Sequence, residues 1–443
     1  MSLTKISSFL SQPGQYDAYC TGVSVDTRTL KAGELYIAIE GDNFDGHEFV
    51  LEAQAKGACA VVVNRKIEGV EIPQFVVLDT VDALARVAQA HRLTMNCQVI
   101  ALTGSNGKTS TKEMIAHILP PNSHATRGNL NNHIGAPLTA LQLSSEHRYA
   151  VFELGANHIG EIAHTAAVVH PDVALINNIA PAHVGEFGSI EGVARAKGEI
   201  YQGLSAAGIA VINDDDAYAH FWDDIVSTKK VLRFSTQHKA DIYAENVRLN
   251  EQGNGQFSLI LPNAQAEISL KVPGLHSVQN AVAAATCCYA LGISITEIQR
   301  GLSEFTGVKG RMTVLQGMNR STIIDDTYNA NLRSVLAALE VLALRPGKKV
   351  FVFGDMGELG DCTDSHHEQV GTRARELGIN KLFTCGTHSA LTAKKFGDEG
   401  VHFASKEDLV QSLLKELGPD TTVLVKGSRS SAMEKIVQKL LED

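Results

Sequence analysis

Short apolar runs alternate with helix-like stretches over most of the chain, and this pattern sets the predicted fold. From Gln98 to about Gly310 the apolar runs are VIALTG, YAVFELG, VALINNI and GIAVIND. From Arg311 a second alternation starts, with STIIDDTYN, KKVFVFGDMGELG, NKLFTCG and TTVLVKGS. Strands that alternate with helices in this way form parallel sheets with helices on both faces. The pattern therefore predicts two doubly wound α/β domains.

The first part of the chain predicts a smaller α/β domain. Strand-like runs GVSVDTRTL, ELYIAIEG and ACAVVVN occur there, with the helix-like stretch HEFVLEAQAKGA between the last two. At 443 residues the chain is also too long for one compact core. We therefore expect three domains, with boundaries uncertain by several residues. They are residues 1–97, residues 98–310 as the nucleotide-binding domain, and residues 311–443 as a Rossmann-like domain.

Composition and charge exclude several classes of protein. The net charge of −10 argues against an extended nucleic-acid surface, while leaving room for a local basic pocket that binds phosphates. No apolar run reaches the roughly 20 residues needed to cross a bilayer, and the N-terminal segment lacks the features of a secretory signal. The seven cysteines are scattered and form no C-x-x-C pair, so we expect reduced thiols in a cytoplasm.

The stretch VIALTGSNGKTSTKEMIAHIL predicts a phosphate-binding loop between a strand and a helix. Leu102 stands where the common pattern G-x-x-x-x-G-K-[ST] has its first glycine. The free amides and the positive dipole end at a helix N-terminus nevertheless suit an anion. Lys108 adds a mobile charge, and the Thr109 hydroxyl can ligate Mg²⁺ bound to a phosphate. An ordinary strand–turn–helix junction is the alternative, but the combination of all these parts favours a site.

Two charged residues fall within apolar patterns. Glu153 ends the strand YAVFELG, at the edge where open α/β sheets bind ligands. A carboxylate there is costly unless it is paired or bound to metal, so we favour a metal ligand over a solvent-facing side chain. Lys197 lies on the apolar stripe of its helix, where a charged lysine is disfavoured. Periodicity alone favours snorkelling or a buried ion pair for Lys197.

Further polar motifs lie at strand ends and helix starts. GNLNNHIGAPLTAL is either a capped turn or a site whose uncharged amides bind a polar peptide or a phosphate. GLHSVQNAV opens a helix, GRMTV marks the last domain boundary, and IIDDTYNANLRS ends a strand. The candidate residues in these motifs are Asn129, Asn131, Asn132, His276, Asn280, Arg311, Asp326, Tyr328, Asn329 and Asn331.

These motifs, in this order, resemble those of the Mur ligase superfamily, whose members make peptide bonds with ATP. The phosphate loop is similar to the family's variant of that loop, with Gly104, Ser105, Asn106, Gly107, Lys108, Thr109 and Ser110 as its residues. SVDTRTLKAGELYIAIEGDNFDGHEF resembles the family's uridine-nucleotide-binding domain, with Ser24, Asp26, Thr27, Arg28, Asp45, Gly46 and His47 as the matching residues. Leu332 departs from the pattern, because the family commonly has proline there, and we expect a looser loop.

The resemblance implies a mechanism and its ligands. The carboxylate of a UDP-N-acetylmuramoyl-tripeptide attacks the γ-phosphate of ATP, and the amine of D-alanyl-D-alanine then attacks the acyl phosphate. Lys108 would neutralise the transferring phosphate, and Thr109 and Glu153 would hold one Mg²⁺. His183 and Lys197, carbamylated by CO₂, would help hold a second Mg²⁺. The resemblance also implies that His276, Asn280, Arg311 and Asp326 contact the nucleotide and that domains close over the intermediate.

Several alternatives remain open at this point. GNLNNHIGAPLT, DDTYNAN and FGDMGELG favour addition of D-alanyl-D-alanine, but a sibling ligase that adds a single amino acid is the main rival. DTRTLKAGELYIA argues against a folylpolyglutamate-type synthetase, and the absence of N-K-x-D argues against a GTPase. A non-catalytic nucleotide-binding protein would not need Glu153, His183 and Lys197 together. The sequence leaves the third residue of the tripeptide open and gives no reason to expect more than a monomer.

Overall fold

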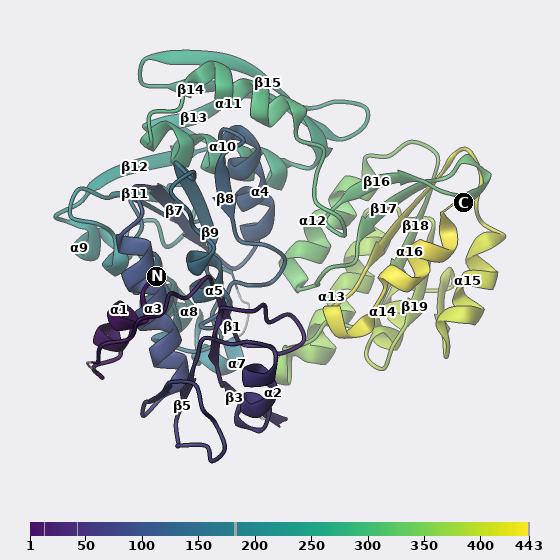
Figure 1. The fold of residues 1–443 in the computed structure, drawn as a ribbon. Helices are drawn as coiled ribbons and strands as arrows, with labels where there is room; N and C mark the ends of the chain where they lie inside the picture. Colours follow the sequence, from purple (N-terminus) through teal and green to yellow (C-terminus); the bar gives the residue numbers. More distant parts are fainter. Residues whose placement is uncertain (13, 42, 181–183, 442–443) are drawn as a thin grey trace.

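The structure, a computed structural model, describes residues 1–12, 14–41, 43–180 and 184–441. It contains three larger sheets in succession along the chain (Figure 1), which confirms the predicted three-domain α/β architecture. The six-stranded sheet of the C-terminal domain stands on the right of Figure 1, beside the other two domains. All seven cysteines are free thiols, as predicted. Within the described residues, no helix is both long enough and apolar enough to cross a membrane.

The N-terminal domain is a four-stranded parallel sheet of order β1-β2-β5-β6. Helices α1 and α3 pack on one face, where Leu35 and Ile37 point, and α2 packs on the other face against Tyr36. A hairpin of β3 and β4 leads into the short turn η1. The elements are α1 (Leu3–Phe9), β1 (Val23–Ser24), β2 (Leu35–Ile37), β3 (Glu40–Gly41), β4 (Phe44–Asp45), η1 (Gly46–Phe49), α2 (Val50–Ala55), β5 (Ala60–Val63), β6 (Gln74–Val76) and α3 (Thr80–Leu93).

The central domain is built on a nine-stranded sheet of order β15-β14-β13-β12-β11-β10-β7-β9-β8. Strands β7 to β13 pair in parallel, as predicted. Strand β14 then pairs antiparallel with β13, and β15 pairs antiparallel with β14. The strands are β7 (Gln98–Thr103), β8 (Ser123–Ala125), β9 (Tyr149–Glu153), β10 (Val173–Ile176), β11 (Ile209–Asn213), β12 (Lys230–Ser235), β13 (Ile242–Leu249), β14 (Asn254–Leu261) and β15 (Ala264–Pro273).

Two layers of helices cover the central sheet and fix where a ligand can bind. Helices α4, α10 and α11 bury one face, while α5, α6 and α8, with the inner side of α3, bury the other. Strand β7 lies between β9 and β10, so the chain changes direction around the carboxyl end of β7. The helical elements are α4 (Lys108–Ile118), α5 (Gly135–Leu141), α6 (Glu161–Val169), α7 (Val184–Phe187), α8 (Ile190–Gly198), η2 (Glu199–Gly203), α9 (Asp223–Val226), α10 (Leu275–Ala290) and α11 (Ile295–Glu304).

The C-terminal domain has a six-stranded sheet of order β16-β17-β21-β18-β19-β20, parallel except for the edge strand β16. Helices α12 and α13 pack on one face, and α15 and α16 pack on the other. The elements are β16 (Thr313–Gln316), η3 (Met318–Arg320), β17 (Thr322–Asp326), α12 (Leu332–Ala343), β18 (Lys348–Phe353), η4 (Gly360–Cys362), α13 (Thr363–Glu376), β19 (Lys381–Cys385), α14 (Ser389–Phe396), β20 (Gly400–Phe403), α15 (Lys406–Leu414), β21 (Thr421–Lys426), η5 (Arg429–Ser431) and α16 (Glu434–Leu440).

Candidate active site

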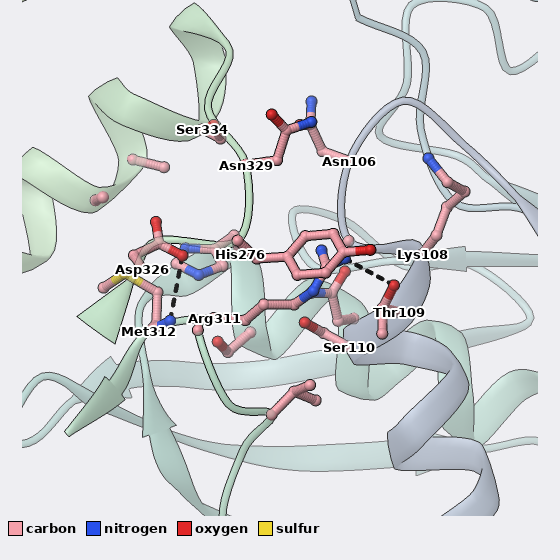
Figure 2. A pocket seen from close by; sticks show the side chains of 18 of the residues that line it. Asn106, Lys108, Thr109, Ser110, His276, Arg311, Met312, Asp326, Asn329 and Ser334 are labelled. Atoms are coloured by element: carbon pink, nitrogen blue, oxygen red, sulfur yellow. Dashed lines mark hydrogen bonds between the residues drawn. The ribbon is translucent and has the colours of Figure 1, made fainter. Parts of the chain in front are cut away.

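A cavity of about 310 Å³ lies between the phosphate loop, the start of α10 and the first residues of the C-terminal domain (Figure 2). Most of the predicted site residues of these three segments line it. The loop and the start of α4 contribute Ser105, Asn106, Gly107, Lys108, Thr109 and Ser110, the segment before α5 contributes Asn131, and the end of β9 contributes Glu153. The later segments contribute His276, Asn280, Arg311, Asp326, Tyr328, Asn329 and Asn331.

The phosphate loop is a tight turn whose glycines are required by their surroundings. Gly107 has a φ of 78° and forms the N-cap of α4. A Cβ at Gly107 would lie 2.4 Å from Asn280 Oδ1 and 2.6 Å from Asn177 Nδ2. The Lys108 ammonium donates a hydrogen bond to the Gly104 carbonyl, 2.8 Å away, and so spans the loop. Burial lowers the pKa of Lys108, while Glu153 partly opposes the shift.

Thr109 and Glu153, predicted as ligands of one Mg²⁺, are in direct contact. The Thr109 hydroxyl donates to Glu153 Oε2 at 2.7 Å, and Asn131 Nδ2 donates to Oε1 at 2.8 Å. Glu153 is only 2% exposed, so the solvent-facing alternative is wrong. A hydroxyl and a carboxylate beside a phosphate loop are the hard oxygen donors that Mg²⁺ prefers. The donor set therefore fits this ion.

Arg311 reaches the same point from the C-terminal domain. Its Nη2 donates to Thr109 Oγ1 at 2.9 Å (Figure 2). Its guanidinium lies 4.2 Å from the centre of the Tyr328 ring. The Arg311 Nε atom is buried without a hydrogen-bond partner among the described residues. A cation placed over an aromatic ring is held in one orientation. Arg311 is thus positioned to meet an anion that enters between the domains.

Lys197 lines a second cavity, of about 220 Å³, which the phosphate loop also lines. Lys108, Asn131, Asn132 and Glu161 line the same cavity. Lys197 is 4% exposed, which excludes snorkelling, and it makes no hydrogen bond or ion pair with any residue in the described ranges. Burial, and then the charge of Lys108, lower the pKa of Lys197 to about 7. His183, predicted to bind the same ion, falls outside the described residues.

The two other asparagines of GNLNNHIGAPLTAL have different surroundings. Asn132 Oδ1 accepts hydrogen bonds from the amides of Gly135 and Ile134, at 2.8 Å and 3.2 Å, so it caps the start of α5. It also lines the second cavity, whereas Asn129 lines neither cavity. The capped-turn interpretation therefore holds for Asn132, and Asn131 is the member of this motif that contacts the candidate metal ligand.

The other predicted nucleotide contacts also line the first cavity. Asn280 Oδ1 accepts a hydrogen bond from Asn177 Nδ2 at 2.9 Å and lies against the phosphate loop. Asp326 Oδ1 accepts from the Met312 amide at 3.2 Å, and its other oxygen pairs with the ammonium of Lys426. Burial lowers the pKa of His276, which lies next to Asp326 (Figure 2).

Two residues beside this cavity were not among the predicted site residues. Asn177 and Asn178 directly follow β10, and Asn178 lines the cavity. Asn178 brackets the loop residue Asn106, since its Oδ1 accepts from the Asn106 amide and its Nδ2 donates to the Asn106 carbonyl. A polar residue directly after an apolar strand was the available signal for both. Lys426, a candidate from the motif KGSRSSAME at the carboxyl end of β21, lines the cavity as well.

Asn331 connects the C-terminal domain to the phosphate loop. Its Oδ1 accepts from the Ser334 amide at 3.0 Å, which caps α12, and its Nδ2 donates to Asn106 Oδ1 at 2.7 Å. Leu332 is the first residue of α12, a position where the amide has no partner within the helix. Proline would suit this position, and the looser loop expected with Leu332 stays a prediction.

The predicted uridine-binding residues lie outside both cavities and form local charge pairs. The guanidinium of Arg28 binds the Asp26 carboxylate, with Nη2 2.6 Å from Oδ2, and this contact lowers the pKa of Asp26 to about 2. Ser24 donates to the Asp26 carbonyl at 3.0 Å. The Thr27 carbonyl accepts from Lys56 at 2.8 Å. A ligand for this group remains a prediction.

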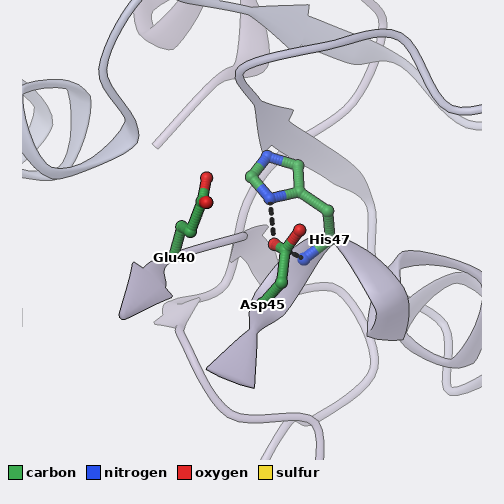
Figure 3. A group of neighbouring side chains, drawn as sticks. All are labelled: Glu40, Asp45 and His47. Carbon is green, nitrogen blue, oxygen red and sulfur yellow. Dashed lines mark hydrogen bonds and ion pairs between the residues drawn. The ribbon is translucent and has the colours of Figure 1, made fainter. Parts of the chain in front are cut away.

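Asp45, Gly46 and His47 form a second local group at the hairpin of β3 and β4. His47 Nδ1 lies 2.6 Å from Asp45 Oδ1, and Nε2 accepts from the Asn64 amide at 3.0 Å. The Gly46 carbonyl accepts from the Tyr36 hydroxyl at 2.9 Å. Figure 3 shows Glu40 beside Asp45 and His47, but both ring nitrogens of His47 already have protein partners. We therefore interpret Glu40, Asp45 and His47 as residues that stabilise the hairpin rather than as metal ligands.

Three family profiles match the chain in sequence order. The descriptions are "Mur ligase family, catalytic domain" for residues 19–92, "Mur ligase middle domain" for residues 102–288, and "Mur ligase, glutamate ligase domain" for residues 310–429.

Curated relatives and solved structures match over nearly the whole chain. A UDP-N-acetylmuramoyl-tripeptide–D-alanyl-D-alanine ligase of Escherichia coli (strain K12) is 42% identical over 434 residues, covering 96% of this chain and 95% of the relative. The ligase of that name from Bacillus subtilis (strain 168) is 33% identical, and the match covers 99% of this chain and 96% of the relative. A crystal structure of MurF from Acinetobacter baumannii has a TM-score of 0.93 at 35% identity, covering 100% of this chain and 99% of that one. The crystal structure of MurF ligase from Thermotoga maritima in complex with ADP has a TM-score of 0.85 at 26% identity, and the match covers 96% of this chain and 98% of that one.

Proposed function

The chain belongs to the Mur ligase family, and on that premise we propose the reaction and the part each residue has in it. The protein is an ATP-dependent ligase that adds D-alanyl-D-alanine to UDP-N-acetylmuramoyl-tripeptide, which yields the UDP-muramoyl-pentapeptide precursor of peptidoglycan. The observation that carries the residue assignments is the chain of contacts from Arg311 through Thr109 to Glu153 inside the interdomain cavity. It places a cation, a hydroxyl and a carboxylate around the end of a phosphate loop.

The first step is transfer of the γ-phosphoryl group to the terminal carboxylate of the tripeptide. Lys108 sits at the phosphate loop, and Arg311 faces it from the C-terminal domain, so both can stabilise charge that spreads over the phosphoryl oxygens. Thr109 and Glu153 would hold Mg²⁺, which supplies positive charge to the phosphates when it is bound. The amine of D-alanyl-D-alanine then attacks the acyl carbon, and phosphate leaves.

For Lys197 we propose that its side chain is carbamylated and that the carbamate, together with His183, holds a second Mg²⁺. Three observations support it: the side chain is buried, it has no partner among the described residues, and it lines a cavity next to Lys108. The lowered pKa leaves a large neutral fraction near neutral pH. A neutral amine can attack CO₂, and loss of one proton then gives an anion beside the Lys108 cation.

The N-terminal group around Asp26 and Asp45 is the proposed binding site for the uridine end of the substrate. Its local charge pairs and its position outside the ATP cavity suit an extended substrate that crosses from one domain to the next. The C-terminal residues Tyr328, Asn329 and Asn331 would then meet the peptide end. We also propose that the protein works as a monomer in the cytoplasm.

The test is phosphate release from ATP with UDP-N-acetylmuramoyl-tripeptide and one amine at a time. D-Alanyl-D-alanine should drive release and give a pentapeptide by mass, whereas D-alanine, L-lysine, meso-diaminopimelate and buffer should not. Release with a single amino acid would support the sibling ligase instead. ATP binding without turnover for any amine would support a non-catalytic binding protein, and Lys108→Ala provides the inactive reference.

A further inference from the structure

Glu199 is a buried carboxylate that has no part in the mechanism above. It is 7% exposed and is the first residue of η2, two positions after Lys197. Oε1 accepts a hydrogen bond from the Gly160 amide at 2.8 Å, and Oε2 accepts from the Ala163 amide at 3.0 Å. Both donors belong to the N-terminal turn of α6. Glu199 therefore joins two segments that are far apart in sequence.

Among the described residues, no other side chain caps the N-terminus of α6. Gly160, its N-cap residue, has no side chain, and its φ of 94° is one that glycine adopts easily. The free amides and the positive dipole end of a helix stabilise a carboxylate, and hydrogen bonds to a charged acceptor are stronger than neutral ones. Glu199 thus supplies the cap of α6 from another element, and the cap ties η2 to α6.

Residues in or next to both tied segments line the 220 Å³ cavity. Lys197, from α8, lines it, and so do Gly155 and Asn157, from the loop after β9, and Glu161, the first residue of α6. Glu161 Oε2 accepts from the Asn157 amide at 2.8 Å, so the loop after β9 is itself attached to α6. The contacts of Glu199 therefore set the separation between Lys197 and the loop that follows Glu153.

Lys197 depends on its backbone for its position, because it has no side-chain partner among the described residues. The neighbouring Gly198 lies against Trp222, where an added Cβ would be 2.6 Å from the indole Nε1. The Trp222 Nε1 donates to the Ala194 carbonyl at 3.0 Å. The last turn of α8 is thus held by Trp222 on one side and by Glu199 on the side of α6.

We infer that Glu199 is a positioning residue for Lys197: it holds the last turn of α8 where the Lys197 carbamate can form and act as a metal ligand. The inference rests on the proposed carbamate. In that reaction the lysine nitrogen forms a bond to the carbon of CO₂, an electron pair moves to one oxygen, and one amine proton leaves to solvent. Glu199 touches neither CO₂ nor substrate and acts through the backbone alone.

The test compares Glu199→Gln, Glu199→Ala and a matched control, Asp79→Ala, in the full-length protein. Asp79 also accepts hydrogen bonds from two amides at a helix N-terminus, those of Val81 and Asp82 at 2.7 Å and 3.1 Å, but it is the N-cap residue of α3 itself and lies outside both cavities. Carbamate occupancy is measured by ¹³C NMR in ¹³C-labelled bicarbonate, beside kcat, KM for ATP and the melting temperature. Gln retains one of the two acceptors, so it should fall between the wild type and Ala.

We expect Glu199→Ala to lose most of the carbamate signal and to lower kcat about tenfold to a hundredfold, with KM for ATP little changed. Raising bicarbonate should restore both the signal and kcat, whereas Asp79→Ala should change the melting temperature alone. A full carbamate signal in Glu199→Ala would overturn the inference while leaving the Lys197 proposal intact. No carbamate in the wild type would overturn both, and phosphate release would still test the ligase reaction separately.

Discussion

The phosphate-loop region and the uridine-binding region contain similar residue types in opposite settings. In the central domain Glu153 is 2% exposed and Lys197 is 4% exposed. In the N-terminal domain the Arg28 side chain is 87% exposed and the Arg65 side chain 52% exposed. A charge pair in water competes with solvent and salt, whereas a buried charge depends on the partner that the fold provides.

The origin of the partners differs as well. Arg28 and Asp26 are two residues apart, so their contact is local. Glu153 and Thr109 are 44 residues apart, and Arg311 and Thr109 are 202 residues apart. The contact of Glu153 with Thr109 exists only when the central domain is folded, and that of Arg311 with Thr109 only when the C-terminal domain is also docked against it. We therefore expect substitutions in the phosphate-loop region to lower enzymatic activity strongly, and substitutions in the uridine-binding region to lower it only slightly.

The largest effect is expected for Lys108→Ala, which should lower kcat by about a thousandfold or more because it removes a cation from the transferring phosphate. The melting temperature should change little, since the substitution also removes the desolvation cost of a buried cation. Steady-state kinetics and thermal melts measure the two effects, with the exposed Lys230→Ala as control. A large loss of stability with modest loss of activity would contradict the contrast between the regions.

The pH dependence of Lys197 gives the next effect. Its folded-state pKa is lowered to about 7, so the neutral amine that reacts with CO₂ dominates above that pH and the protonated amine dominates below it. Carbamate occupancy and kcat should therefore rise with pH through about 7, and the neutral fraction should fall about tenfold per unit below it. ¹³C NMR with labelled CO₂ follows the signal, and Lys197→Met supplies its baseline. A carbamate signal independent of pH would contradict the assignment.

The same contrast explains how far the sequence could be interpreted. Periodicity and the glycine turn predicted β7, the loop and α4, because these depend on neighbours along the chain. The unfavourable placement of Glu153 at the end of an apolar strand predicted a metal ligand, because burial of charge is costly wherever it occurs. For Lys197, periodicity alone favoured snorkelling or a buried ion pair, and only the family resemblance indicated a site.

Contacts between elements that are far apart in the sequence were beyond this kind of argument. Nothing near Asn331 indicates a partner at Asn106, and nothing near Lys426 indicates Asp326, since each pairing arises when separate elements meet. The antiparallel β14 and β15 were recognised as strand-like runs, but their direction depends on the sheet edge that they join. The sequence therefore predicts which residues need a partner better than it predicts the partner.

A smaller effect is expected at the contact between the domains. Asn331→Ser keeps an N-cap for α12 but is too short to reach Asn106, so KM for ATP should rise about threefold to tenfold, the value of one net hydrogen bond. Asn331→Ala should add a loss of stability, because it removes the cap too. Comparing kinetics and melts of the two variants separates the roles. Equal KM values for the wild type and Asn331→Ser would show that docking does not depend on this bond.

The smallest effect is expected for Arg28→Ala, which tests the exposed charge pairs of the uridine-binding region. Its pair with Asp26 is local and largely solvated, so the melting temperature should stay within about 2 °C of the wild type. If the region binds the uridine end of the substrate, KM for UDP-N-acetylmuramoyl-tripeptide should rise about twofold to fivefold, with kcat unchanged. Raising the salt concentration should shrink this difference, because exposed charges are screened whereas the contacts of Glu153 are not. A fall in kcat, or a difference in KM that persists in high salt, would mean that Arg28 acts as a buried charge does. The proposed contrast between the exposed and the buried region would then be wrong.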